Sequence, residues 1–179
     1  GRGTDPATML LRLGGDFGES QVNDQAITSG SLIVRLTGGR LDGGASVRMP
    51  GGLVQADLTG TPFAETPAFT LRNGRFENLD VGAFAGDSTL ASDLTGTFAA
   101  EVAGTDPATA RAGATLTLEP SSFNDAQLDG TVALTLADGV GQADATLALA
   151  GGTAMVDATY AFPDDDAEGH GGRHLCLPR

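Results

Sequence analysis

The sequence contains no lysine and no tryptophan. All ten of its basic residues are arginine, and 23 acidic residues bring the net charge to −13 at pH 7. A surface this acidic repels the phosphates of a nucleic acid, so we expect no nucleic-acid partner. It also repels anionic lipid headgroups, which argues against electrostatic adhesion of this segment to a membrane surface.

Cysteine and long apolar runs are scarce as well. Cys176 is the single cysteine, so no disulfide can form within the chain. The sequence has no initiator methionine, no signal peptide and no apolar run of about 18 residues. We therefore expect an internal piece of a longer protein, with any targeting segment or membrane anchor outside it.

Glycine is abundant, at 27 of 179 residues, which is about twice its usual share. The glycines are spread between short apolar runs, a distribution that favours many turns over a flexible linker. The chain is also repetitive. The same residues recur, first 101 and then 100 positions apart, in Gly-Thr-Asp-Pro-Ala-Thr at 3–8 and 104–109, Asn-Asp at 23–24 and 124–125, and Gly-Gly at 51–52 and 151–152. This pattern indicates an internal repeat of about 100 residues.

Alternation of apolar and polar residues predicts β-strands. Within residues 27–37, Leu32, Val34 and Leu36 share one face while Ser31 and Arg35 occupy the other. The same period predicts further strands at residues 8–13, 44–49, 54–58, 94–102, 114–118, 132–136, 143–149 and 154–162.

Turn signals separate these strands. Asp42-Gly43, Asn73-Gly74 and Asp138-Gly139 each have the sequence of a hairpin turn. Residues 14–26 are predicted to form a glycine-rich turn and an edge, and Asp80 is predicted to cap one short helical turn within residues 80–86.

These patterns predict an all-β protein, an elongated and curved antiparallel β-sheet repeat that forms a groove, with at most one short helical turn. Residues 1–103 form the first repeat unit with its connecting segment. Residues 104–162 form a second, truncated unit. Residues 163–179 lack the alternation and are interpreted as a disordered or non-native tail.

Few residues have the types and spacing that a catalytic or metal-binding site requires. The tail holds His170, His174 and Cys176, at a spacing that zinc tolerates, but this stretch looks foreign to the fold. The acidic run at 164–168 lacks the spacing of a calcium loop. Asp5 and Asp106 occupy equivalent positions of the repeat and are expected in turns. Without histidine or tryptophan before residue 163, we expect no catalytic residue, no metal and no cofactor.

An apolar sheet face must be covered. Periodicity alone favours a dry core, but an open trough is the alternative, and burying an acyl chain there would contribute about 0.8 kcal/mol per CH₂. The side chains predicted to line such a lipid groove are Leu32, Val34, Leu36, Val47, Met49, Val54, Leu58, Leu116, Leu118, Val132, Leu134, Leu136, Leu147, Leu149, Val156 and Tyr160.

The amino-acid pattern of several stretches resembles that of the AsmA/TamB-like group of bacterial envelope proteins. The resemblance covers roughly residues 3–162 and is carried by degenerate, non-catalytic stretches at residues 30–44, 49–58, 76–86 and 90–96. It implies a periplasmic segment of an inner-membrane-anchored protein with a hydrophobic β-groove. It also implies phospholipid acyl chains as ligands, carried between the inner and outer membranes. Support of outer-membrane assembly is the other implied role, with a barrel partner bound through regions outside this segment. The alternative is an extracellular repetitive β-stalk or adhesin with a sealed core.

Overall fold

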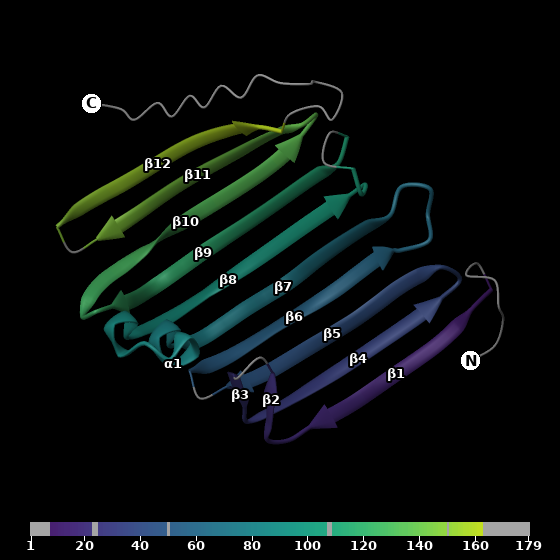
Figure 1. The fold of residues 1–179 in the computed structure, drawn as a ribbon, viewed down its shortest axis with the longest axis horizontal. Helices are drawn as coiled ribbons and strands as arrows, with labels where there is room; N and C mark the ends of the chain where they lie inside the picture. Colours follow the sequence, from purple (N-terminus) through teal and green to yellow (C-terminus); the bar gives the residue numbers. More distant parts are fainter. Residues whose placement is uncertain (1–7, 23–24, 50, 107–108, 150, 163–179) are drawn as a thin grey trace.

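The chain folds into one open antiparallel β-sheet of ten strands in the order β1-β4-β5-β6-β7-β8-β9-β10-β11-β12. The computed structural model describes residues 8–22, 25–49, 51–106, 109–149 and 151–162. Figure 1 shows the ten strands side by side, with neighbours in the sheet also neighbours along the chain. The strands are β1 (Leu10–Phe17), β4 (Ser29–Thr37), β5 (Arg40–Met49), β6 (Gly52–Thr61), β7 (Ala68–Leu79), β8 (Ser92–Ala103), β9 (Arg111–Phe123), β10 (Ala126–Ala137), β11 (Val140–Leu149) and β12 (Gly152–Ala161).

The remaining elements are small. β2 (Ser20–Val22) and β3 (Gln25–Ile27) form a separate two-stranded hairpin, and α1 (Val81–Ala85) and the 3-10 helix η1 (Ser88–Leu90) connect β7 to β8. The sheet is not closed into a barrel, and the all-β antiparallel fold predicted from the sequence is confirmed.

The repeat is visible in the strand boundaries. β5 and β6 begin and end exactly 100 residues before β11 and β12. The two repeats belong to one continuous sheet, because β8 of the connecting segment pairs with β9 of the second copy. The duplicated sequence therefore lengthens a single sheet.

The two copies differ at one place. In the second copy, β9 and β10 are long strands that meet at Asn124 and Asp125, both with positive φ. In the first copy the equivalent strands are interrupted, and their ends form the β2–β3 hairpin. The neighbouring strand explains the difference. The end of β9 is held by pairing with β8, at Ser92↔Phe123, whereas β1 has a paired strand on one side only among the described residues.

Four of the eight phenylalanines lie directly opposite a glycine on the adjacent strand. A Cβ atom on Gly60 would stand 2.7 Å from the Phe69 ring, so the ring covers the space that the glycine leaves. Aromatic rings that cover cross-strand glycines stabilise a sheet by burying apolar area where the glycine has no side chain. The four pairs are Phe17↔Gly30, Gly60↔Phe69, Gly74↔Phe98 and Phe76↔Gly96.

Register shifts are confined to the middle of the sheet, in the strand pairs from β6 to β10. β7 carries two of them, near Asn73 and Asn78, whose φ angles are 50° and 51°. Extra residues of this kind bend a strand and increase its twist. The outer pairs, from β1 to β6 and from β10 to β12, keep continuous registers.

Three local predictions are wrong. Asn73-Gly74 lies inside β7 and forms a bulge instead of a hairpin turn, because a positive φ serves either purpose. Asp42-Gly43 lies inside β5, since the turn is already made at Gly38 and Gly39, with φ angles of 56° and 76°. The first strand continues beyond residue 13 to Phe17, and residues 20–27 form a hairpin.

Other local predictions are confirmed. Asp138-Gly139 makes the turn between β10 and β11, with φ angles of 50° and 73°. Asp80 is the N-cap of α1, and its side chain accepts hydrogen bonds from the backbone N–H groups of Gly82 and Ala83. A capping carboxylate satisfies donors that the first helical turn leaves without a partner.

The Phe–Gly pairs generate a stability prediction. In Gly96→Ala, the new Cβ collides with the backbone oxygen of Thr117 and stands 2.7 Å from the Phe76 ring, so we expect a loss of about 1–3 kcal/mol in the free energy of unfolding. Urea unfolding measures it. Gly113→Ala is the control, because its nearest neighbour would lie at 3.6 Å; we expect no loss, or a gain of about 0.5–1 kcal/mol. Equal loss in both variants would contradict the role of the pairs.

Candidate functional site

The strand registers place all sixteen side chains predicted as groove-lining on one face of the sheet. Residues directly opposite each other in an antiparallel ladder point to the same side. Leu36, for example, is connected through one row of paired residues to Leu136 and Tyr160. We call this the apolar face. The whole predicted set lies on it: Leu32, Val34, Leu36, Val47, Met49, Val54, Leu58, Leu116, Leu118, Val132, Leu134, Leu136, Leu147, Leu149, Val156 and Tyr160.

The apolar face includes residues that the sequence analysis left out. The connecting strands contribute Phe69, Leu71 and Phe76 from β7 and Phe98 from β8, in register with the predicted set. The edge strand β1 contributes Leu13, opposite Val34. Leu13 and Phe98 lie within strands predicted from the sequence, at 8–13 and 94–102, and Phe69 and Leu71 follow the same two-residue alternation, so the signal was present although these residues were not in the predicted groove set.

The apolar face is only partly buried. Among the described residues, only Leu36, Phe76 and Ala110 are buried apolar residues, and Leu36 keeps 5% exposure. Leu134 is 48% exposed and Tyr160 is 61% exposed. Within the described part of the chain, side chains on this face shield one another, and the ten strands form a single layer.

All the charged side chains of the ten-stranded sheet lie on the opposite face, which we call the polar face. Arg12, Arg35 and Asp42 form one row across β1, β4 and β5, and Asp144 lies opposite Asp157 on β11 and β12. The apolar face of the described strands is therefore free of formal charge, although the whole chain carries a net charge of −13.

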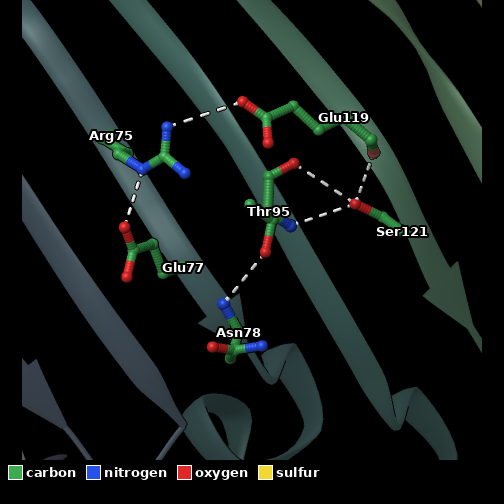
Figure 2. A network of polar contacts seen from close by, with 6 residues as sticks. All are labelled: Arg75, Glu77, Asn78, Thr95, Glu119 and Ser121. Carbon is green, nitrogen blue, oxygen red and sulfur yellow. Dashed lines mark hydrogen bonds and ion pairs between the residues drawn. The ribbon is translucent and has the colours of Figure 1, made fainter.

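A polar network spans the register shifts of β7, β8 and β9 (Figure 2). Arg75 Nε lies 2.7 Å from Glu77 Oε1, and Arg75 Nη1 lies 3.6 Å from Glu119 Oε1. The hydrogen bond to Glu77, followed by the charge of Glu119, holds the pKa of the Arg75 guanidinium above its usual range.

Ser121 supplies the second part of this network. Its side chain accepts from the Thr95 N–H at 3.0 Å and lies 2.7 Å from the Glu119 carbonyl oxygen, to which it donates. The Thr95 hydroxyl in turn accepts from the Asn78 N–H at 3.2 Å. Where a bulge interrupts the ladder, these hydroxyls replace the missing backbone partners, because buried backbone groups need a hydrogen bond.

Three adjoining hollows lie mainly over the polar face. They have volumes of about 480, 360 and 350 Å³. The first two share Gln55 and Asn73, and the second and third share Ala99 and Thr115. These hollows are lined largely by side chains that the sequence analysis placed on the outside of the groove. The apolar face, in contrast, is marked by its partly exposed apolar side chains.

The α1–η1 segment holds the second group with a shifted pKa, the carboxylate of Asp87. The Asp87 carboxylate accepts from the Thr89 hydroxyl at 2.7 Å and from the Thr89 N–H at 2.9 Å. These hydrogen bonds, with the hydroxyl contributing most, hold the pKa of Asp87 below its usual range. They stabilise the first turn of η1, where Asp87 is the N-cap.

Of the candidate metal-binding and acidic groups in the sequence, the structure describes only some. The described residues hold no cluster of three or more His, Cys, Asp or Glu side chains suited to a metal ion. His170, His174, Cys176, Asp5 and the acidic run at 164–168 lie outside the described residues. Asp106 lies in a turn, where its carbonyl accepts from the N–H groups of Thr109 and Ala110. None of the helices in the described ranges has the length and apolar character needed to traverse a bilayer.

Comparison with known proteins identifies no relative. No family model, no curated protein and no solved structure matches this chain.

The Asp87 contact generates a pH prediction. Thr89→Val removes the hydroxyl donor, so we expect the pKa of Asp87 to rise toward its ordinary value of about 3.9, as measured by NMR titration. A lowered pKa in the folded state stabilises the protein above the unfolded pKa, and this stabilisation disappears as the pH falls through the folded value. The stability difference from the unmodified chain should therefore be present at neutral pH and absent in strong acid. Thr146→Val, on β11, is the control and should leave the Asp87 titration unchanged.

Proposed function

We propose that this chain is a non-enzymatic segment of a periplasm-spanning envelope protein, and that its apolar face binds the acyl chains of phospholipids. In this proposal, the parent protein is anchored in the inner membrane and carries lipids between the inner and outer membranes, or supports outer-membrane assembly. The partner there would be an outer-membrane barrel protein bound outside this segment. The resemblance of the sequence to AsmA/TamB-like proteins supports the cellular setting.

One observation carries the proposal: an uncharged apolar face extends across all ten strands and is only partly buried. Leu134, Val156 and Tyr160 are among its most exposed members. Monomeric soluble proteins rarely expose large contiguous apolar patches without a binding role. Covering this face is favourable by roughly 25 cal/mol per Å² of apolar area removed from water.

The dimensions of the face suit a lipid tail. Ten strands at a spacing of about 4.8 Å make the sheet roughly 43 Å long across the strands. One leaflet contributes about half of the roughly 30 Å hydrocarbon core of a bilayer, so an acyl chain is about 15 Å long. The face is long enough for an acyl chain to occupy several successive positions along it. The absence of formal charge from the apolar face of the described strands supports an uncharged ligand portion, since an unpaired charge against an acyl chain is costly.

The direct test is photo-crosslinking in cells. A photoreactive amino acid at Leu134 or Leu147, on the apolar face, should capture lipid that mass spectrometry identifies. Thr135 and Thr146 are matched controls, because they lie one residue away on the same strands and on the polar face. Capture at all four positions, or at none, would contradict the proposal. A face that is inaccessible to the probe in the whole protein would instead favour the sealed β-stalk.

A binding measurement gives the complementary prediction. Leu134→Asp places a carboxylate within the apolar face, so we expect a fluorescent fatty acid to bind at least about tenfold more weakly, equivalent to roughly 1.4 kcal/mol. Thr135→Asp adds the same charge on the polar face and should bind nearly as the unmodified chain does. The control removes general repulsion between the fatty-acid carboxylate and the acidic protein from the comparison. Similar weakening in both variants would exclude the apolar face as the binding surface.

A further inference from the structure

The hollow of about 480 Å³ lies over the polar face of β4, β5 and β6, each of which has a paired strand on both sides. Its volume is in the range of ligand-binding clefts. Gly44 and Ser46 of β5 form its floor. Ile33 on β4 and Asp57 on β6 lie on either side of Gly44 in one row of the sheet. Because Gly44 has no side chain, an open gap of two strand spacings, roughly 10 Å, separates them.

One wall of this hollow is polar and is fixed by a hydrogen bond. Asn73 Nδ2 donates to Asp57 Oδ2 at 2.8 Å. Asp57 Oδ1 leans over the floor, 3.0 Å from the position that a Cβ atom on Gly44 would take. The bulge of β7 supplies Asn73, whose φ angle is 50°. A carboxylate and an amide are therefore held side by side at this wall.

The opposite wall is apolar. Ile33 lies on the polar face and is 55% exposed. Between the walls, Ser31, Ser46 and Gln55 line the hollow. Within the described part of the chain, these three side chains have no hydrogen-bond partner. The hollow thus combines a hydrocarbon surface with donors and acceptors that are available to a ligand.

The charges beside the hollow favour a neutral ligand. Arg72 on β7 lies directly opposite Asp57 in the ladder. Opposite charges at such positions attract each other, so the guanidinium offsets the charge of the carboxylate. A free cation would have to compete with this arginine, whereas a neutral ligand would not.

The second copy of the repeat lacks the features that form this hollow. Gly44 corresponds to Asp144, and Ile33 corresponds to Ala133. A side chain therefore occupies the floor position in the second copy, and Asp144 lines none of the three hollows. The hollow depends on particular side chains of the first copy and not on the sheet alone.

The hollow continues across the strands as a trough. It adjoins the second hollow at Gln55 and Asn73, and the second adjoins the third at Ala99 and Thr115. Together they extend from β4 to β10, which lie side by side in Figure 1, over roughly 29 Å at about 4.8 Å per strand spacing. An extended β-linked glycan advances by a similar distance per sugar. Hydroxyl side chains are frequent along the second and third hollows: Thr70, Thr97, Thr115, Thr117 and Thr135.

We propose that this trough binds a neutral linear glycan, which lies across the strands with one sugar between Ile33 and Asp57. A sugar ring has C–H groups on its faces, which suit Ile33. Its hydroxyls both donate and accept hydrogen bonds, which suits Asp57, Asn73 and the serines. An extended peptide suits the trough less well, because it adds to a sheet at a strand edge, and β4 to β10 are paired on both sides.

Calorimetric titration with cellohexaose and chitohexaose, two neutral β-linked oligosaccharides, tests the proposal. We expect saturable binding of at least one of them. The corresponding disaccharide reaches across only part of the trough and should bind at least about tenfold more weakly. Binding of neither oligosaccharide, or equal affinities for the long and the short one, would overturn the proposal.

Two variants that carry residues of the second copy locate the site. Gly44→Asp fills the floor, so we expect at least about tenfold weaker binding. Ile33→Ala removes most of the apolar wall and should weaken binding severalfold. Thr146→Asp is the matched control, because it adds the same charge to the polar face of β11, outside the three hollows, and should bind as the unmodified chain does. Circular dichroism confirms that each variant keeps its sheet.

The variants also give results that would contradict the site. Equal weakening in Gly44→Asp and Thr146→Asp would do so, as would full affinity in both Gly44→Asp and Ile33→Ala. The glycan and lipid proposals can fail separately, because they use opposite faces. Leu147→Asp, on the apolar face, should weaken fatty-acid binding and leave glycan binding unchanged.

Discussion

Strict two-residue alternation is the constraint on which this structure depends. In a sheet of one layer, each strand has to keep its apolar side chains on the same side as those of both neighbours, because a slip of one residue moves them all to the other face. The registers maintain this from β1 to β12, with Leu11 at one end and Tyr160 at the other on a single row. The separation of charge from apolar area follows from that rule alone.

The same rule explains why the fold has so little interior. A two-layer protein buries its apolar faces against each other, whereas the described strands here have only neighbours within the sheet. Phenylalanine rings over cross-strand glycines, such as Phe76 over Gly96, recover part of the missing burial within the layer. The rest of the apolar area remains exposed, which is why a ligand or partner for it has to be sought.

The sequence was sufficient for most of the long strands and for their faces, because a period of two survives in one sequence without any knowledge of neighbours. It was also sufficient for the Asp80 cap, which depends on local hydrogen bonds. It failed at Asn73-Gly74 and Asp42-Gly43, since a residue pair that allows a turn also allows a bulge or an ordinary strand, and the adjacent strand decides between them. The strand registers, the bulges and the hollows over the polar face needed the assembled sheet.

The register shift between Leu128 and Gly130 has a consequence for how the duplicated module diverges. The copies match 101 positions apart as far as Asn124-Asp125 and 100 positions apart from Gly130 onward, so a one-residue length difference falls beside this bulge. Had the difference fallen inside a regular strand such as β11, the side chains beyond it would have exchanged faces. Bulges are thus the positions that tolerate insertion and deletion. There the repeat can change in length without moving the following side chains to the other face of the sheet.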